Sequence, residues 1–342
     1  MKDIRDYSLL AHNTFGIDAK CKRFLEYSSV EEAQQIVAGL TAADQPLLIL
    51  GGGSNLLLTG DYEGTVIHSA IKGIKVLDNE KLHSSDSVFL SCGSGEVFDD
   101  VVAYAVKHGY HGAENLSIIP GEVGASAVQN IGAYGVEAKD IIYKVEAVEI
   151  ATGKVVVFDN QDCQYSYRQS RFKHEWKDKY LVTHVIYRLS KHFVPDLDYG
   201  NIRTSLAAKK IGNPSAQQLR DVIIEIRNSK LPDPKVQGNA GSFFMNPIVQ
   251  KAKYEELAAL YPGMPHYTID AEHEKIPAGW MIDQCGWKGQ SLGRAGVHDK
   301  QALVLVNRGG ATGEEIVNLC ETIRKDVKQK FGIDIHPEVN VK

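Results

Sequence analysis

The chain has 342 residues, of which 43% are hydrophobic and 24% charged, and its formal net charge is −5. This length exceeds what one hydrophobic core usually supports, so we expect two or three domains. The acidic balance argues against broad nucleic-acid binding, and the lack of a long apolar run argues against a membrane-spanning helix.

The first third of the chain predicts a helix followed by a buried strand. Residues 29–32 form a capping box, and the helix that they begin has an apolar face that includes Val37. The strand at 46–50 runs directly into a glycine-rich segment that begins at Gly51. Further short strands are predicted at 66–67, 74–77 and 88–92, followed by an amphipathic helix at 97–106.

The rest of the chain continues to mix strands and helices. A hairpin is predicted where residues 145–150 and 155–158 flank an Ala-Thr-Gly-Lys turn, and 180–189 alternates like a strand. Helices are predicted at 217–227 and after a second capping box at 312–315, with Gly332 as the C-terminal stop. With a last strand at 333–341, the class is α+β.

The five cysteines are widely spaced and form no CxxC pair. Such a set predicts reduced, mostly buried thiols, and it argues against a zinc site or a redox disulfide. The first residues lack the pattern of a secretory signal. We therefore expect a cytoplasmic protein without a bound metal.

The first glycine segment follows a strand but departs from the known nucleotide loops. In a Rossmann fingerprint the third glycine would stand at Leu56, and no helix pattern begins there. A Walker loop also fails, since no Gly-Lys-Ser/Thr follows. Successive glycines can still expose N–H groups to a phosphate, and a simple tight turn is the alternative.

The second glycine-rich segment, residues 119–135, reads as a long irregular loop with four glycines, three alanines and a serine among its residues. Small residues allow a backbone to approach a large flat ligand or a diphosphate closely. Purely structural loops of this length are uncommon. Two such loops together favour a dinucleotide with an extended diphosphate.

Six segments resemble, in order, segments of the UDP-N-acetylenolpyruvoylglucosamine reductase family. They are the Asn-Thr-Phe-Gly segment and five others, at 13–16, 48–56, 119–135, 165–172, 231–247 and 337–339. One match of this kind is weak, whereas six in order along nearly the whole chain are specific. The segment 194–201 with Tyr199 is similar to the tyrosine-bearing loop of one branch of the family.

The resemblance implies an α+β fold with an FAD-binding domain of the vanillyl-alcohol-oxidase type in two lobes and an α+β substrate domain. We expect residues 1–70 to form the first lobe, 71–215 the second lobe with the tyrosine loop, and 216–342 the substrate domain, whose tail strand returns to the active site. The implied activity is NADPH-dependent, FAD-mediated reduction of UDP-N-acetylenolpyruvoylglucosamine to UDP-N-acetylmuramate in peptidoglycan precursor synthesis. NADPH would occupy the cleft first and leave before the UDP-sugar enters. Nucleic acid and membrane are not expected partners.

The same resemblance assigns residues to the two ligands. The residues implied in FAD binding lie in the two glycine segments and one later helix: Gly51, Gly53, Ser54, Asn55, Leu56, Ile119, Pro120, Gly121, Gly124, Ala125, Ser126, Asn130, Gly132, Gly135 and Arg227. The residues implied in contact with the UDP-sugar are Tyr167, Tyr199, Lys230, Asn246 and Gln301. Tyr199 would close over the bound substrate.

Three residues inherit catalytic roles from their motif positions: Arg168, Ser242 and Glu338. Reduction of an enol ether of pyruvate builds negative charge on the carbon beside the carboxylate, and a guanidinium can hold that carboxylate bidentately. Arg168 suits this role, while Glu338 would carry a proton or orient Arg168. Ser242 would donate the proton to carbon, and because a hydroxyl is a poor acid, Lys230 is the candidate that polarises it.

One residue departs from the family pattern, and two other functions stay open. Many relatives have a basic residue where this chain has Met245, which puts any cation contact at that position in doubt. An FAD-dependent oxidase of an alcohol or a sugar lactone is a second possibility, although residues 119–135 contain no histidine or cysteine for a covalent flavin link. A non-catalytic FAD-binding sensor is the third, and the intact Arg168, Ser242 and Glu338 set argues against it.

Overall fold

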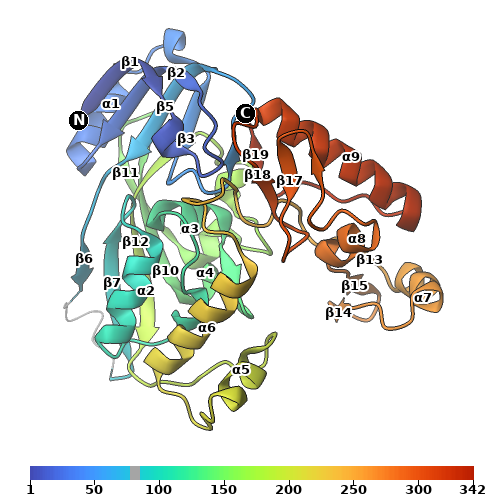
Figure 1. Cartoon of the computed structure of the whole chain (residues 1–342). Helices are drawn as coiled ribbons and strands as arrows, with labels where there is room; N and C mark the ends of the chain where they lie inside the picture. Colours follow the sequence, from blue (N-terminus) through green and yellow to red (C-terminus); the bar gives the residue numbers. More distant parts are fainter. Residues whose placement is uncertain (78–84) are drawn as a thin grey trace. The chain divides into compact units, whose positions relative to one another are not determined.

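The computed structural model describes residues 1–77 and 85–342, and its contacts divide the chain into two compact units (Figure 1). Unit 1 comprises Met1–Tyr7, Cys21–Gly52 and Glu63–Arg227. Unit 2 comprises Ser8–Lys20, Gly53–Tyr62 and Asn228–Lys342. Within the described residues, no helix combines the length and the apolar character that a membrane crossing requires. The division into three regions at 70 and 215 stays a prediction.

The first sheet of unit 1 has four strands in the order β1-β2-β5-β3, with β3 parallel to β5. The bounds are β1 Lys2–Ser8, β2 Lys20–Tyr27, β5 Tyr62–Ser69 and β3 Leu47–Leu50. Helix α1 (Val30–Gly39) begins where the Ser29 hydroxyl accepts from the Glu32 N–H at 3.2 Å, which confirms the predicted cap. Strand β1 was not predicted, since nearly all of its residues are exposed and no apolar pattern marks it.

The second sheet of unit 1 is antiparallel, in the order β11-β10-β12-β7-β6. Its strands are β11 Val155–Asp159, β10 Ile142–Glu149, β12 Tyr180–Ser190, β7 Ser87–Gly93 and β6 Ile74–Val76. The associated helices and short strands are α2 Phe98–Lys107, α3 Val123–Gln129, α4 Ala138–Ile141, α5 Ile202–Ala208, α6 Ala216–Lys230, β8 Gly132–Ala133 and β9 Val136–Glu137.

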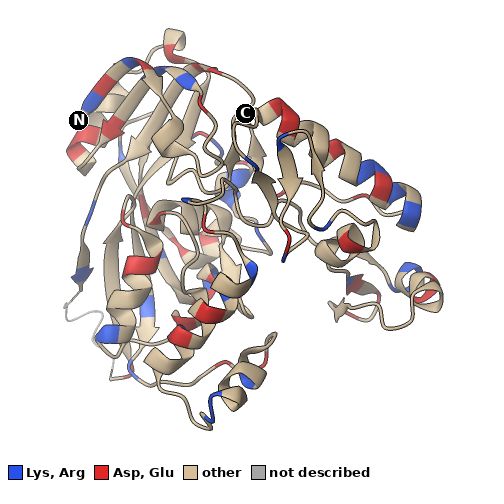
Figure 2. Ribbon diagram, in the orientation of Figure 1, with Lys and Arg blue, Asp and Glu red and all other residues tan. Residues whose placement is uncertain are grey.

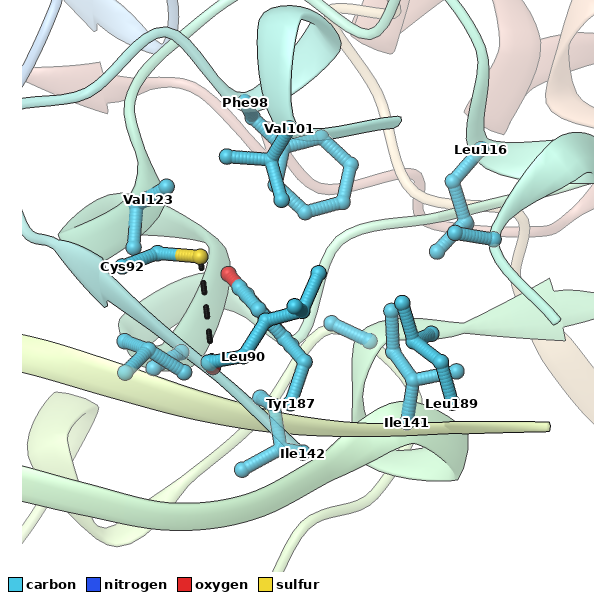
Figure 3. Close-up of a cluster of buried hydrophobic side chains, with 14 of the residues drawn as sticks. Leu90, Cys92, Phe98, Val101, Leu116, Val123, Ile141, Ile142, Tyr187 and Leu189 are labelled. Carbon is cyan, nitrogen blue, oxygen red and sulfur yellow. Dashed lines mark hydrogen bonds between the residues drawn. The ribbon is translucent and has the colours of Figure 1, made fainter. Parts of the chain in front are cut away.

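The main core of unit 1 lies between this sheet and helices α2, α3 and α4. Figure 3 shows Phe98 of α2 and Val123 of α3 facing strand residues that include Leu90 and Tyr187. A second core packs α1 between the two sheets, with Val148 and Leu181 among its members. Because the glycine segments join these elements, their positions are set by a packed scaffold.

The cysteines are all free, and four of the five are buried, as predicted. Burial disfavours the thiolate, and it raises the pKa of Cys92 and Cys320 to about 12. In Figure 3 the Cys92 thiol lies inside the core, where it donates to the carbonyl of Leu90 at 3.9 Å. These thiols are therefore unreactive core residues.

Unit 2 contains three small sheets and three helices among its described elements. The sheets are ordered β13-β15-β14, β16-β17-β18 and β19-β4. The bounds are β4 Leu56–Leu57, β13 Ile248–Gln250, α7 Lys251–Leu260, β14 Tyr267–Thr268, β15 His273–Lys275, α8 Ala278–Gln284, β16 Ser291–Leu292, β17 Ala295–Val297, β18 Leu305–Asn307, α9 Gly313–Phe331 and β19 Asn340–Val341.

Helix α9 confirms the second predicted capping box, since Thr312 and Glu315 satisfy each other's backbone N–H groups. Its first turn is acidic and its last turn basic (Figure 2), an order that complements the helix dipole. It ends at Gly332 with φ +70°, as expected for a C-terminal glycine. The last strand is shorter than predicted, because only Asn340–Val341 pairs, in parallel with β4.

Candidate active site

The two glycine segments meet within unit 1. A Cβ atom on Gly51 would lie 3.1 Å from the Ala125 Cβ, and one on Gly52 would lie 3.4 Å from the Gly121 Cα. Larger side chains at either position would therefore push the segments apart. After Gly53 the chain enters the short strand β4 instead of a helix, which confirms that this is not a Rossmann loop.

The second glycine segment is not irregular throughout, as its composition suggested, but contains helix α3. The Val123 N–H donates to the Glu96 carbonyl at 2.9 Å, and the Gly124 N–H donates to the Ser94 carbonyl at 2.8 Å. A Cβ on Gly124 would lie 3.0 Å from that of Ser94. The small size of Gly124 thus serves packing, and its N–H is already bound within the protein.

Two polar residues of α3 and its end are also committed to the scaffold. The Ser126 hydroxyl is fully buried, 2.6 Å from the Tyr187 hydroxyl and 2.6 Å from the Val123 carbonyl. Asn130 has φ +48°, and its amide donates to the Ser166 carbonyl at 2.8 Å. Asn130 therefore ties the end of α3 to the segment that carries Arg168.

Arg168 rests on the second glycine segment. Its guanidinium donates to the Gly132 carbonyl at 2.6 Å and to the Asn130 carbonyl at 3.3 Å, and it lies 5.4 Å from the centre of the Tyr167 ring. A Cβ on Gly132 would lie 2.9 Å from the guanidinium, so only glycine leaves room for it. Arg168 has φ +58°, a left-handed conformation that is uncommon outside glycine and is concentrated at functional sites.

Arg227, on α6, supplies a second cation in the same unit. Its Nε is buried and has no hydrogen-bond partner among the residues that the structure describes. Burial lowers the pKa of Arg227, Tyr134 and Asp99 oppose this shift, and the positive charge of Arg168 adds to it. Asp99 binds Arg220 through both carboxylate oxygens, at 2.7 and 2.8 Å. A buried cation in this situation favours an anionic ligand.

The tyrosine loop borders the end of the second glycine segment. Tyr199 packs edge-on against Tyr134, with ring centres 6.3 Å apart, and a Cβ on Gly135 would lie 3.6 Å from that of Tyr199. The buried Asn115 amide donates to the carbonyls of Tyr134 and Asp196, at 2.9 and 3.1 Å. This amide joins the loop to the glycine segment.

The end of the first glycine segment lies in unit 2, beside the C-terminal tail. The Gly53 carbonyl accepts from the Thr14 N–H at 3.1 Å. The Asn55 amide donates to the Glu338 carbonyl at 3.3 Å, and the Asn55 carbonyl accepts from the Asn340 N–H at 3.1 Å. The buried Leu56 pairs with Asn340 in β4 and β19.

Ser242 and Glu338 come from two backbone segments that are bonded to each other in unit 2. The Glu338 N–H donates to the Phe243 carbonyl at 2.8 Å, and Phe244 pairs with Pro337 in an isolated bridge. Glu338 thus lies across from the residue that follows Ser242. Ser242 is exposed, whereas Phe243 and Phe244 are buried and anchor the segment.

Two of the predicted substrate-contact residues of unit 2, Asn246 and Gln301, are hydrogen-bonded close to the same segment. The Asn246 carbonyl oxygen of the side chain accepts from the Ala278 N–H at 2.9 Å, at the start of α8. The Gln301 side chain accepts from the Leu303 N–H at 3.3 Å, and the Leu303 carbonyl accepts from Phe243. Lys230 is exposed at the end of α6.

Met245, the departure from the family pattern, donates its backbone N–H to the His336 carbonyl at 3.0 Å. It therefore belongs to the same pair of backbone segments as Ser242 and Glu338. Arg168 belongs to unit 1, and its convergence with those two residues stays a prediction.

Sequence reasoning missed His68 and assigned no role to Glu122. The two are hydrogen-bonded in unit 1, and the Glu122 side chain lies against Gly51 and Gly52. No local motif marks such a pair, because the residues are 54 positions apart and meet only through packing of β5 against the second glycine segment.

The residues of unit 1 fit the diphosphate and ring system of FAD in their chemistry. The two glycine segments approach closely, with only the side chains of Ala125 and Glu122 beside Gly51 and Gly52, and a buried guanidinium lacks a partner at Nε among the described residues. Anions are commonly bound by such exposed backbone and by arginine. Of the residues predicted to bind FAD, Ile119 packs against the main core, and Pro120 precedes the contact at Gly121.

Comparisons with known proteins cover both units. Residues 22–159 match the family described as FAD binding domain, and residues 233–342 match the C-terminal domain of UDP-N-acetylenolpyruvoylglucosamine reductase. A UDP-N-acetylenolpyruvoylglucosamine reductase of Bacteroides fragilis is 56% identical over 334 residues, which cover 98% of each chain. One of Porphyromonas gingivalis is 47% identical over 338 residues, with the same coverage.

Solved structures agree at the level of the fold. The UDP-N-acetylenolpyruvylglucosamine reductase from Thermus caldophilus aligns over 99% of this chain and 98% of its own, with a TM-score of 0.66 and 21% identity. The 6-hydroxy-D-nicotine oxidase from Arthrobacter nicotinovorans aligns over 97% and 86%, with a TM-score of 0.55 and 14% identity. The predicted α+β fold, with an FAD-binding domain of the vanillyl-alcohol-oxidase type, is confirmed.

Proposed function

The chain belongs to the UDP-N-acetylenolpyruvoylglucosamine reductase family, and we infer that it is an FAD-dependent enzyme that uses NADPH to reduce UDP-N-acetylenolpyruvoylglucosamine to UDP-N-acetylmuramate. The observation that carries this inference is the 56% identity with a reductase of that name along 98% of both chains. The match of residues 233–342 to the reductase's C-terminal domain favours this activity over an alcohol or lactone oxidase. We propose that the enzyme acts in the cytoplasm, on an early intermediate of peptidoglycan synthesis.

The unit-1 residues described above are proposed to hold FAD. Gly51 and Gly121 would leave room for the diphosphate, and Arg227 would supply a buried positive charge. When bound, FAD supplies the hydride that it has received from NADPH. The remaining chemistry is the binding of an enolpyruvyl carboxylate, the stabilisation of charge and the delivery of one proton to carbon.

Arg168 is proposed to bind the carboxylate of the enolpyruvyl group. Its guanidinium is already oriented by the Gly132 and Asn130 carbonyls, so little conformational entropy is lost when a carboxylate binds. Negative charge that develops beside that carboxylate is stabilised by a fixed cation more than in water. Tyr167, under the guanidinium, would help to keep it in place.

Ser242 is proposed to donate the proton and Glu338 to assist. The support is that their segments are bonded to each other and that Ser242 projects from a backbone anchored by two buried phenylalanines. A serine hydroxyl is weakly acidic, so it requires a neighbour that carries or withdraws charge. Lys230 remains the candidate that polarises the Ser242 hydroxyl, and Tyr199, Asn246 and Gln301 are proposed to contact the UDP-sugar.

An anaerobic absorbance experiment tests this function. NADPH should bleach the flavin band of the purified protein, and addition of the enolpyruvyl UDP-sugar, but not of a simple alcohol, should restore it. Ser242→Ala should leave the bleaching step within about twofold of wild type and slow the return at least about 10²-fold. Ser291→Ala, at an exposed position of the same unit, is the matched control. A colourless protein that takes up no flavin would refute the assignment.

A further inference from the structure

His68 occupies a position from which it can control the first glycine segment. It lies on β5 directly opposite Leu50, the last residue of β3 before Gly51. It is only 8% exposed, and its ring stacks near that of Phe24, with centres 6.1 Å apart. A buried polar ring at this point requires hydrogen-bond partners.

Both ring nitrogens of His68 face carboxylates. Nδ1 lies 3.0 Å from Glu26 Oε2, and Nε2 lies 3.2 Å from Glu122 Oε1. Neutral imidazole has one donor and one acceptor nitrogen, so one of these contacts would place two lone pairs together. Imidazolium donates to both carboxylates. The geometry is therefore that of a cation bridging two anions.

The surroundings balance this charge. Lys2 on β1 binds the other oxygen of Glu26 at 2.6 Å. The neighbouring strands add no further charge at these positions: β3 has the apolar Leu50 opposite His68, and on β2 the Tyr27 hydroxyl donates to the Val182 carbonyl. Burial by itself lowers the pKa of His68, but the hydrogen bonds and charges of Glu122 and then Glu26 outweigh it, so that the pKa is raised. Lys2, Glu26, protonated His68 and Glu122 together are neutral.

Glu122 joins this network to the proposed diphosphate site. It precedes α3 in the second glycine segment. Its Cγ would lie 3.5 Å from a Cβ on Gly52, and its Oε2 would lie 3.6 Å from a Cβ on Gly51. A carboxylate at this distance borders the space where a diphosphate would lie. Loss of the His68 proton would leave one uncompensated negative charge there.

We propose that His68 is a proton-dependent positioning residue for the first glycine segment. As imidazolium it holds Glu122 against this segment and balances the charge of the Glu122 carboxylate, so that FAD is bound more tightly when His68 is protonated. The inference rests on the proposed placement of the FAD diphosphate beside Gly51 and Gly121. It adds a regulation by pH, because the same proton sets both the spacing of the segments and the charge beside them. FAD affinity should fall as pH rises through the titration of His68.

The test is the dissociation constant of FAD, measured from the fluorescence of flavin released when the holoenzyme is diluted between pH 6 and pH 9. For the wild type, Kd should rise about fivefold across this range, the size expected for one added charge near a phosphate at a partly screened site. In Glu122→Gln the rise should disappear, with binding at pH 9 about fivefold tighter than in the wild type.

Two further variants complete the experiment. His68→Gln should give a constant, weak affinity close to that of the wild type at pH 9. Asp86→Asn, which removes the carboxylate of the exposed Asp86–His192 pair in the same unit, is the matched control and should keep the wild-type profile.

A wild-type Kd that does not change with pH, or a Glu122→Gln variant that keeps the wild-type rise, would overturn the role of His68. A purified protein that binds no FAD at any pH would instead overturn the proposed function. If His68→Gln fails to fold, Glu122→Gln still decides the question, because glutamine keeps the size of the side chain and can still hydrogen-bond to His68.

Discussion

Gly53 should be among the least replaceable residues of unit 2, for a reason that concerns packing more than ligand binding. It has φ +64°, and a Cβ at this position would overlap the His12 carbonyl, lying 2.6 Å from the carbonyl carbon and 2.9 Å from the Asn13 Cα. The obstructing atoms are backbone, so they cannot move aside as a flexible side chain can. Gly53→Ala must therefore displace the segment around residues 12–14.

The cost can be separated into two parts. The left-handed conformation alone costs alanine about 1–2 kcal/mol. Displacement of the neighbouring backbone also strains the hydrogen bond from the Thr14 N–H to the Gly53 carbonyl, worth about 1 kcal/mol, and loosens packing. We expect a total of about 3–5 kcal/mol. Gly16→Ala is the matched control, because Gly16 has φ +66° and a Cβ there would meet nothing within 4 Å.

Urea unfolding followed by far-ultraviolet circular dichroism, with FAD bound and removed, measures both variants. Gly16→Ala should lose about 1–2 kcal/mol, and Gly53→Ala at least about 2 kcal/mol more. The strain should also reach Asn239, because the Thr14 carbonyl accepts from the Asn239 N–H and the Thr14 hydroxyl donates to the Asn239 carbonyl. Equal destabilisation by the two variants would show that the segment accommodates a Cβ and that the clash argument is wrong.

Three other outcomes follow from the structure. Arg168→Lys should lower kcat/KM about 10²–10³-fold despite the retained charge, because lysine lacks the planar fork, and steady-state kinetics with the enolpyruvyl UDP-sugar would measure this. Tyr187→Phe should cost about 1 kcal/mol in urea unfolding, since it removes the 2.6 Å contact with the Ser126 hydroxyl in the core. The pKa of His68 is raised in the folded state, so the stability that its proton contributes is complete below the unfolded pKa of about 6.5 and is lost as pH rises through the folded pKa. The urea midpoint of His68→Gln should therefore lie furthest below that of the wild type near pH 6 and least below it near pH 9.

The parts of the fold that the sequence predicted well are those determined locally. The caps at Ser29 and Thr312 and the stop at Gly332 formed as expected, since each depends on residues within one helical turn. The predicted strand at 180–189 also formed, as part of β12. Strand β1 escaped prediction because its residues are mostly exposed and polar.

The candidate site was predictable only where family motifs mark it. The role of a small residue cannot be read from its type, because close approach to a ligand and close approach to another backbone require the same side chain. Gly124 and Ser126 were assigned to FAD by the family resemblance, and within the protein Gly124 packs on Ser94 and the Ser126 hydroxyl is bonded to Tyr187. Both contacts help to fix the position of α3.

Three non-glycine residues in or against the second glycine segment have a strained, left-handed backbone. Two belong to the segment, and the third, Arg168, contacts it. Asn130, Tyr134 and Arg168 have φ values of +48°, +49° and +58°. Each such residue costs on the order of 1 kcal/mol or more, and it persists only where surrounding contacts determine it. Here those contacts come from the protein itself: the Asn130 side chain binds Ser166, the Asn115 amide binds the Tyr134 carbonyl, and Arg168 donates to Gly132. The guanidinium is therefore oriented by the scaffold before any ligand binds, which is the condition under which a fixed charge stabilises developing negative charge most effectively.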